Sequence, residues 1–150
     1  MSPLVDLQKI TNNKSREELF RLAFFDSLTG VLNRNAFEEY RPRFERARKK
    51  TDLYVTIVDV NNLKLINDSE GHQAGDRTIK FVADVLREVS DWVFRLGGDE
   101  FLLITEKPVI FEHSFIAYGS AYMGKQVSLR TAMSAADIKM YQHKRLKKGR

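Results

Sequence analysis

The chain contains no cysteine, which excludes disulfide bonds and thiolate metal sites and fits the reducing cytoplasm. No apolar run approaches the length of a membrane span, and the N-terminus lacks the apolar region of a signal peptide. Neither an internal repeat nor a long linker is visible in the sequence. We therefore expect a cytoplasmic protein that does not associate with a membrane.

The composition is that of one soluble globular domain with a hydrophobic core, since 43% of the 150 residues are hydrophobic and 30% are charged. The formal net charge of +5 is unevenly placed, because no acidic residue follows Asp137. The basic end suggests a phosphate-rich ligand, although a solvated basic tail explains the charge equally well. The basic residues after Asp137 are Lys139, Lys144, Arg145, Lys147, Lys148 and Arg150.

Two helices are predicted in the first third of the chain. Ser15 and Glu18 form a capping box, the pattern that begins a helix, and apolar residues at helical spacing follow it. A second helix is expected at about 35–49, where Pro42 should kink or interrupt it.

The rest of the chain predicts alternating strands and helices. A β-rich run at 53–58 places Asp59 at the C-terminal end of a strand. A polar loop at 61–75 then leads into a helix, a further strand is expected at 115–122, and a basic helix at 132–148 closes the chain. The apolar residues of the middle helix follow the 3.6-residue period: Ile79, Val82, Ala83, Leu86 and Val89.

Gly97 and Gly98 run into Asp99 and Glu100 between two apolar runs, a pattern that predicts a β-hairpin. Paired glycines supply the positive φ that a tight turn demands, so the two carboxylates should lie at an exposed tip. An ordinary polar hairpin explains this pattern about equally well. The second acidic strand end, at Asp59, favours a ligand site instead.

Neighbouring strands can place Asp59 beside Asp99, where the two carboxylates would repel each other unless a cation held them. Mg²⁺ (or Mn²⁺) is the natural occupant, because it favours one or two carboxylates completed by substrate phosphates and water. Lys64 and the backbone N–H groups of the loop after Asp59 can contact phosphate oxygens. These residues predict metal-assisted phosphoryl or nucleotidyl transfer on a nucleoside triphosphate.

Four blocks of sequence make the chain resemble the diguanylate cyclase (GGDEF) domain family. Together they run in the right order from about residue 22 to the end of the chain. Residues 1–21 are then expected to be an N-terminal segment with the start of a lead-in helix, and residues 22–150 a single domain. The blocks are 26–34, 59–76, 95–101 and, more weakly, 136–144.

The resemblance implies an α+β fold that is palm-like (ferredoxin-like) and related to nucleotide cyclases, with a mostly antiparallel sheet flanked by helices. It also implies that two GTP molecules condense into cyclic di-GMP with release of pyrophosphate. Each domain would hold one GTP, and two domains would face each other. Catalysis would therefore need a homodimer, whether permanent or transient.

The resemblance assigns a metal site and a catalytic set. It implies that Asp59, Asp99 and the backbone carbonyl of Val60 hold the metal. Glu100 belongs to the same cluster, either as a further metal ligand or as an acidic helper. The predicted catalytic residues are Asp99, Glu100 and Lys64.

A second set is expected to bind the substrate. Asn67 and Asp76 match the pair that reads the guanine edge, and a carboxylate can accept hydrogen bonds from N1–H and the 2-amino group, which adenine cannot reproduce. The other residues contact phosphate or let the turn approach the nucleotide: Asn62, Leu63, Gly97, Gly98, Lys144 and, at the end of the chain, Lys148 or Arg150.

Several polar residues near these blocks are given structural roles. Asp26 and Arg34 are expected to form a salt bridge that fixes the turn between the first two helices. His72, between glycines, is interpreted as a hydrogen-bonding loop residue. Arg95 and Asp68 are also interpreted as structural.

The chain departs from the family pattern in several places, among them Leu63, where the family usually has an aromatic residue, and a final Gly-Arg displaced by two residues. Asn61 stands where the family usually has another acidic residue. The segment between residues 101 and 136 is too short for the helix-and-strand unit expected there, so the domain looks trimmed. Many members bind their inhibitory product through Arg-x-x-Asp, but here Glu88 precedes Asp91 and Arg87 comes one residue too early, so we expect no product-inhibition site.

Three functions stay open. The first is a Mg²⁺-dependent diguanylate cyclase of minimal size. The second is a catalytically degenerate, GTP-binding member of the same fold that acts as a sensor or interaction module. The third and most distant is a nucleic-acid-binding relative that uses its basic tail, and nucleic acid is the least expected partner.

Overall fold

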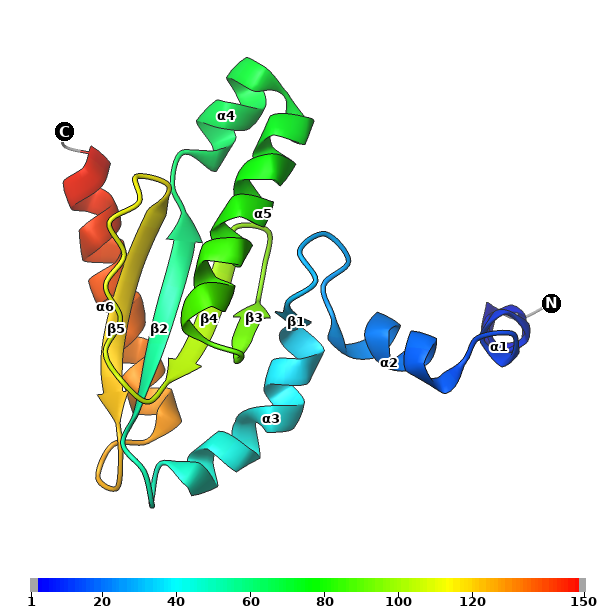
Figure 1. Cartoon of the computed structure of the whole chain (residues 1–150), viewed down its shortest axis with the longest axis horizontal. Coiled ribbons are helices and arrows are strands. Elements are labelled where there is room, and N and C mark those ends of the chain that lie inside the picture. Colours follow the sequence, from blue (N-terminus) through cyan, green and yellow to red (C-terminus); the bar gives the residue numbers. More distant parts are fainter. Residues whose placement is uncertain (1–2, 149–150) are drawn as a thin grey trace.

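The computed structural model describes residues 3–148, and of Lys148 the backbone only. Five strands form one sheet in the order β1-β3-β4-β2-β5 (Figure 1). β1 and β3 are parallel, and the other neighbouring pairs are antiparallel. This mostly antiparallel sheet with helices confirms the predicted α+β fold. The strands are β1 (Leu32–Asn33), β2 (Leu53–Val60), β3 (Val93–Arg95), β4 (Glu100–Thr105) and β5 (Ile116–Met123).

Helices cover both faces of the sheet. On one face α3 and α6 pack against the strands, and on the other face α5 does so (Figure 1). Among the described helices, none is both long and apolar enough to cross a membrane. The helices are α1 (Pro3–Asn12), α2 (Arg16–Phe24), α3 (Arg34–Ala47), α4 (Leu63–Glu70), α5 (His72–Val89) and α6 (Leu129–Lys148).

Alternation along β2 divides the hydrophobic core between the two faces, because successive side chains of a strand point to opposite sides. Val55 and Ile57 pack with the cluster beneath α3 and α6. Val58 and Val60 pack with the cluster beneath α5. β2 is therefore buried on both sides and carries Asp59 rigidly to the edge of the core.

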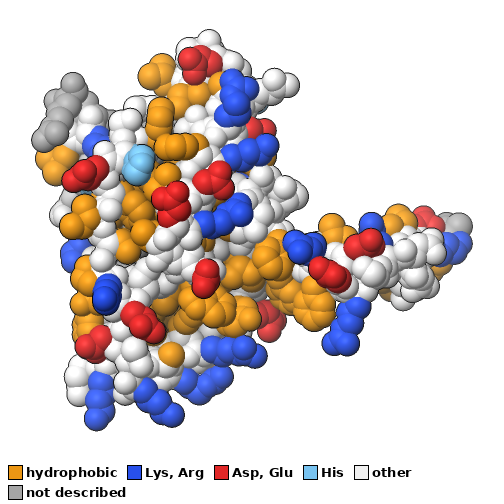
Figure 2. Space-filling model, viewed as in Figure 1, with side chains coloured by type: hydrophobic (Ala, Val, Ile, Leu, Met, Phe, Trp, Pro, Cys, Tyr) orange, Lys and Arg blue, Asp and Glu red, His pale blue; other side chains and the backbone are white. Residues whose placement is uncertain are grey.

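The capping box at the start of α2 is confirmed. The Ser15 hydroxyl accepts from the Glu18 N–H, and the Glu18 carboxylate accepts from the Ser15 N–H, both at 3.1 Å. α1 and α2 bury no side chain and project from the body as an arm (Figure 1). Apolar side chains are exposed along this arm (Figure 2), including Leu4, Leu7, Ile10, Phe20 and Leu22.

Pro42 does not interrupt the second helix, because α3 continues through it. Proline removes one backbone hydrogen bond from a helix interior. Phe37 and Phe44, on either side of Pro42, are both buried in the core, and their packing holds the two halves of α3 in one helix.

The predicted polar loop at 61–75 is wrong. Residues 61–62 link β2 to α4, and the rest of this segment forms α4 and the first turn of α5. Gly71 joins the two helices with φ 91°. α4 buries none of its residues, so its polarity reflects solvent exposure rather than irregular backbone. His72 is accordingly a helical residue, not a loop residue.

Residues 106–115 connect β4 to β5 without a helix, as expected from their length. This coil runs across the sheet on the same side as α5 (Figure 1). Phe111 is buried and meets Tyr118 of β5 edge-on, with the ring centroids 5.2 Å apart. A short coil therefore covers the part of the sheet that α5 leaves open.

Candidate functional site

The two acidic strand ends are neighbours in the sheet. Asp59 of β2 and Glu100 of β4 are direct partners in the antiparallel register. The Val60 N–H donates to the Asp99 carbonyl at 2.9 Å, which extends the pairing by one more hydrogen bond. Asp99 and Glu100 are consequently half-buried, and the prediction of an exposed tip is wrong for both.

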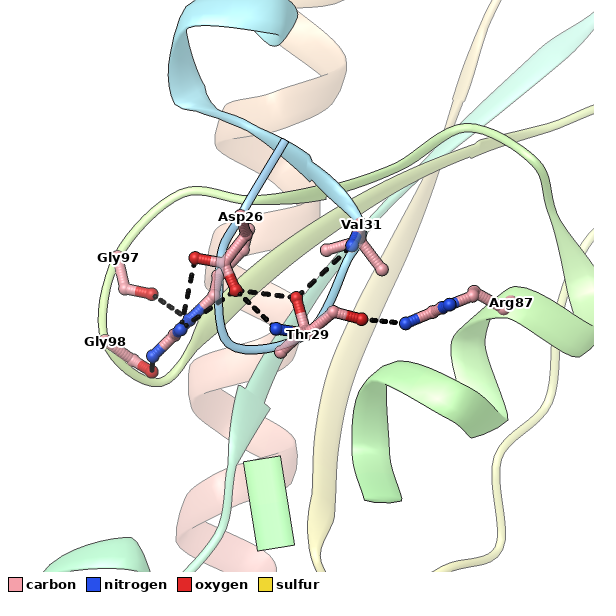
Figure 3. A network of polar contacts seen from close by, with 7 residues as sticks. Asp26, Thr29, Val31, Arg87, Gly97 and Gly98 are labelled. Carbon is pink, nitrogen blue, oxygen red and sulfur yellow. Dashed lines mark hydrogen bonds and ion pairs between the residues drawn. The ribbon is translucent and has the colours of Figure 1, made fainter. Parts of the chain in front are cut away.

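The paired glycines do not have the predicted positive φ. Among the described glycines, positive φ occurs at Gly30 and Gly71. The hairpin turn is held instead by Arg95, whose guanidinium donates to the carbonyls of Gly97 at 3.2 Å and Gly98 at 2.7 Å (Figure 3). A Cβ placed on either Gly97 or Gly98 would meet nothing within 4 Å, so the space above the turn is open.

The same guanidinium binds Asp26, at 3.1 and 3.2 Å to its two carboxylate oxygens (Figure 3). The predicted salt bridge between Asp26 and Arg34 is therefore wrong. Arg34 donates instead to the carbonyl of Leu96, the residue that follows β3 at the start of the hairpin turn, at 3.1 Å. Sequence separation alone could not decide which arginine would meet Asp26, whereas the structural role given to Arg95 is confirmed.

Thr29 completes this network by donating its N–H and its hydroxyl to Asp26, at 2.9 and 2.7 Å. Burial acts to raise the pKa of Asp26, but the hydrogen bonds from Thr29 and Arg95 outweigh it and hold that pKa below its ordinary value. Arg87 of α5 donates to the Thr29 carbonyl, on the side of Thr29 that faces away from Gly97 and Gly98 (Figure 3).

Lys144 of α6 reaches the acidic strand end directly. Its ammonium lies 3.0 Å from Asp59 Oδ2, and the two side chains are 25% and 14% exposed. The residue expected to bind phosphate thus contacts the residue expected to bind metal. Because 85 residues separate them, no local sequence pattern could have predicted this ion pair.

A cavity of about 360 Å³ opens beside this pair. Asp68, interpreted from sequence as structural, also contributes to its wall. It lies four residues after Lys64 on α4, so helical spacing could have placed the two side chains together. The predicted site residues that line the cavity are Val60, Asn62, Leu63, Lys64, Asp99 and Lys144.

Glu100 sits among like charges. Its pKa is raised by burial first, then by Asp137 and Asp59, with a smaller contribution from Asp99, while Arg34 opposes the change. Asp137 is a neighbour that sequence reasoning did not assign to the site. It precedes Lys144 by two helical turns on α6, a spacing that places both on one face of the helix.

The predicted guanine-reading residues lie on the hairpin of α4 and α5, outside the lining of the cavity. Asn67 is half-buried and Asp76 is exposed. Gly75 allows Asn67 to lie across the top of α5, because a Cβ on Gly75 would come within 1.8 Å of Asn67 Oδ1.

The acidic set is not a preformed metal centre. Within the part of the chain that the structure describes, no three Asp, Glu, His or Cys side chains are arranged to hold a metal ion. Two carboxylates and the Val60 carbonyl are nevertheless hard oxygen donors of the kind Mg²⁺ prefers, with its remaining ligands taken from phosphates and water. The residues therefore fit a Mg²⁺ ion that arrives with a nucleotide.

The basic face of α6 is largely engaged with the outer edge of β5. Lys139 donates to the Ser120 carbonyl at 3.0 Å, His143 Nδ1 accepts from the Tyr118 N–H at 3.0 Å, and Lys147 donates to the Ile116 carbonyl. These contacts satisfy backbone groups that an edge strand would otherwise expose. Burial lowers the pKa of both His143 and Lys147. The predicted phosphate contact from the Lys148 side chain or Arg150 lies outside the described residues.

The fold is that of a known family. Residues 23–113 match the family described as diguanylate cyclase, GGDEF domain, and the chain belongs to that family. Family members generally use Mg²⁺ and bind GTP or cyclic di-GMP.

Two curated relatives and one solved structure illustrate the similarity. Cyclic di-GMP phosphodiesterase PdeB of Shewanella oneidensis is 42% identical over 105 residues, covering 67% of this chain and 12% of the relative. Diguanylate cyclase DgcS of the same organism is 35% identical over 111 residues, covering 71% of this chain and 37% of the relative. The coiled coil and GGDEF domain of DgcB from Caulobacter crescentus, in complex with c-di-GMP, superimposes with a TM-score of 0.76 at 23% identity, covering 95% of this chain and 90% of that one.

The chain spans well under half the length of these two curated relatives. The match to DgcB lies at an identity that supports the fold alone.

Proposed function

We propose that this domain condenses two GTP molecules into cyclic di-GMP, with release of two pyrophosphates, in a Mg²⁺-dependent reaction in the cytoplasm. Residues 22–150 are the proposed catalytic unit. The observation that carries the proposal is the register pair of Asp59 and Glu100, with Asp99 beside them and a cavity at their side.

Asp59, Asp99 and the Val60 carbonyl would hold the metal, which when bound polarises the α-phosphate and steadies the leaving pyrophosphate. The chain's own cations serve the phosphates. Lys64 and Lys144 both line the cavity, where their ammonium groups can meet triphosphate oxygens.

Glu100 is proposed to serve either as a further metal ligand or as an acidic helper beside Asp59. In the ligand-free domain its pKa is raised by burial first, and then by like-charge repulsion from Asp137 and Asp59.

Guanine is proposed to lie against Asn67 and Asp76. The Asp76 carboxylate is exposed and can accept from N1–H and the 2-amino group. The open space above Gly97 and Gly98 lets the nucleotide approach the hairpin backbone closely.

A second copy of the chain is proposed to complete the reaction, since each 3′-hydroxyl must attack the α-phosphate held by the other copy. The arm supports this proposal because it leaves apolar side chains uncovered, among them Leu19, Leu22 and, just after α2, Phe25. Burying such side chains between two copies would favour association.

A GTP-binding module without turnover is the second candidate. Its support is the coil at 106–115, which lacks a helix, together with the match to a relative named as a phosphodiesterase. Nucleic-acid binding is disfavoured, because Lys139, Lys144 and Lys147 are engaged within the domain and do not form a free basic patch.

The test is to incubate the purified chain with GTP and Mg²⁺ and to measure both cyclic di-GMP and pyrophosphate. The two products in a 1:2 ratio would support the cyclase. Saturable GTP binding without either product would favour the binding module instead. Salt-sensitive binding of RNA or DNA would favour the third function.

A further inference from the structure

Lys144 contacts both a proposed metal ligand, Asp59, and the cavity proposed for the triphosphate. The ammonium lies 3.0 Å from a carboxylate that is proposed to bind metal. It also lines the cavity proposed to receive the triphosphate. An ammonium and a divalent cation would repel each other at the same carboxylate oxygen, so both cannot occupy it at once.

We propose that Lys144 holds the cation position at Asp59 until a metal–nucleotide complex displaces it, after which its ammonium turns to the triphosphate. This inference rests on the proposed function, since it assumes that metal and nucleotide share the site. What it adds is the displacement of the Lys144 ammonium from Asp59, which makes metal binding and nucleotide binding depend on each other.

The charges around Asp59 explain why a cation is needed there before any ligand arrives. Glu100 is its partner in the sheet register, and Asp99, the residue before Glu100, accepts a backbone hydrogen bond from Val60. Asp137 of α6 adds a further negative charge near Glu100. Lys144 neutralises part of that charge in the ligand-free domain.

Exchange requires only that a side chain moves. His143 and Lys147, on either side of Lys144, hold α6 to the backbone of β5. The flexible four-carbon stem of Lys144 can swing its ammonium while the helix stays fixed. The adjoining cavity of about 360 Å³ gives it room to do so.

The exchange makes metal and nucleotide binding cooperative. Metal alone must compete with the ammonium, and the described part of the chain offers it no cluster of three Asp, Glu, His or Cys side chains. A nucleotide supplies phosphate oxygens to the metal and an alternative partner to Lys144, so each ligand strengthens the binding of the other.

The experiment measures Mn²⁺ affinity by electron paramagnetic resonance in the absence of nucleotide. Lys144→Met removes the competing ammonium, so we expect it to bind Mn²⁺ about three- to tenfold more tightly than the wild type. Lys64→Met removes the same charge from the same cavity, and Lys139→Met removes it from the same helix. Both controls should change the affinity less than about twofold, because neither breaks the pair with Asp59.

A second titration with 3′-deoxy-GTP, which cannot condense, measures the coupling. The nucleotide should tighten Mn²⁺ binding strongly in the wild type and much less in Lys144→Met. The exchange is overturned if Lys144→Met binds Mn²⁺ no better than the wild type, or if Lys64→Met gains as much. Circular dichroism confirms that each variant is folded. Since no turnover is measured, an inactive cyclase and a failed exchange give different results.

Discussion

Arg95 binds Asp26, which precedes it by 69 residues, and so joins two turns of the domain. Its guanidinium contacts both carboxylate oxygens of Asp26 and also the carbonyls of the Gly97–Gly98 turn. The side chains of Arg95 and Asp26 are 15% and 19% exposed. The position of the hairpin that carries Asp99 is thus set by a contact with the first turn of the domain.

Replacing Asp26 should therefore destabilise the domain. Asp26→Ala removes the acceptor for Thr29 and Arg95, and hydrogen bonds to a charged group contribute about 1.5–3 kcal/mol. Urea unfolding at pH 7 should show a free-energy loss of that size. Glu106→Ala, in the exposed coil after β4, is the control and should change stability by less than about 0.5 kcal/mol.

The same substitution has a pH signature. The pKa of Asp26 is lower in the folded domain than its ordinary value of 3.8, so its stabilising contribution is fully present above that value. As the pH falls through the lowered pKa, the contribution is lost. The stability difference between the wild type and Asp26→Ala should shrink below about pH 3.8. A difference that stays constant down to pH 3 would contradict this role.

Base selection should depend on Asp76. Asp76→Ser removes the acceptor proposed for the guanine N1–H and amino group, a loss of about 1.5–3 kcal/mol, or about 10- to 150-fold in the preference for GTP over ATP. Competition binding with both nucleotides measures that preference. Asp84→Ser, two turns further along α5, should leave it unchanged. An unaltered preference in Asp76→Ser would place the guanine site elsewhere.

Gly75 should act through Asn67. A Cβ on Gly75 would meet Asn67 Oδ1 at 1.8 Å, so Gly75→Ala must displace that amide and should weaken GTP binding by about 1–3 kcal/mol. In an Asn67→Ala background the same change should cost much less, because the clashing atom is gone. Equal losses in both backgrounds, measured by calorimetry, would show that Gly75 acts on packing alone.

Product should not bind at the position equivalent to the family's inhibitory site. Glu88 would repel the phosphates of cyclic di-GMP, and Arg87 is engaged with the Thr29 carbonyl and with Asp84 at 3.7 Å. Titration of cyclic di-GMP should therefore show no micromolar binding that depends on Asp91. Binding that disappears in both Arg87→Ala and Asp91→Ala would mean that the shifted arginine serves after all.

Local patterns predicted the parts of the molecule that local physics controls. The apolar run before Asp59 and the glycines before Asp99 indicated a strand end and a hairpin, and both occur. The sheet register then brings Asp59 to Glu100 without further information. Polar segments were harder to assign to a helix or a loop. α4 is one example, because it buries none of its residues and its composition resembles that of a loop.

Long-range side-chain partners could not be predicted. Arg34 and Arg95 carry the same charge near the same turns, and the final packing determines which of them binds Asp26. Lys144 likewise matched a phosphate-binding position in sequence, while its contact with Asp59 depends on how α6 packs against β5 and β2.

The most direct test of the proposed function compares the wild type with Asp99→Ala in a cyclic di-GMP assay with GTP and Mg²⁺. The wild type should form cyclic di-GMP and pyrophosphate. Asp99→Ala should remain folded, because its half-buried side chain lies at the end of a turn, and it should form no product, since losing a charged metal ligand raises the barrier by several kcal/mol. A folded Asp99→Ala protein that turns over at the wild-type rate would contradict the assignment.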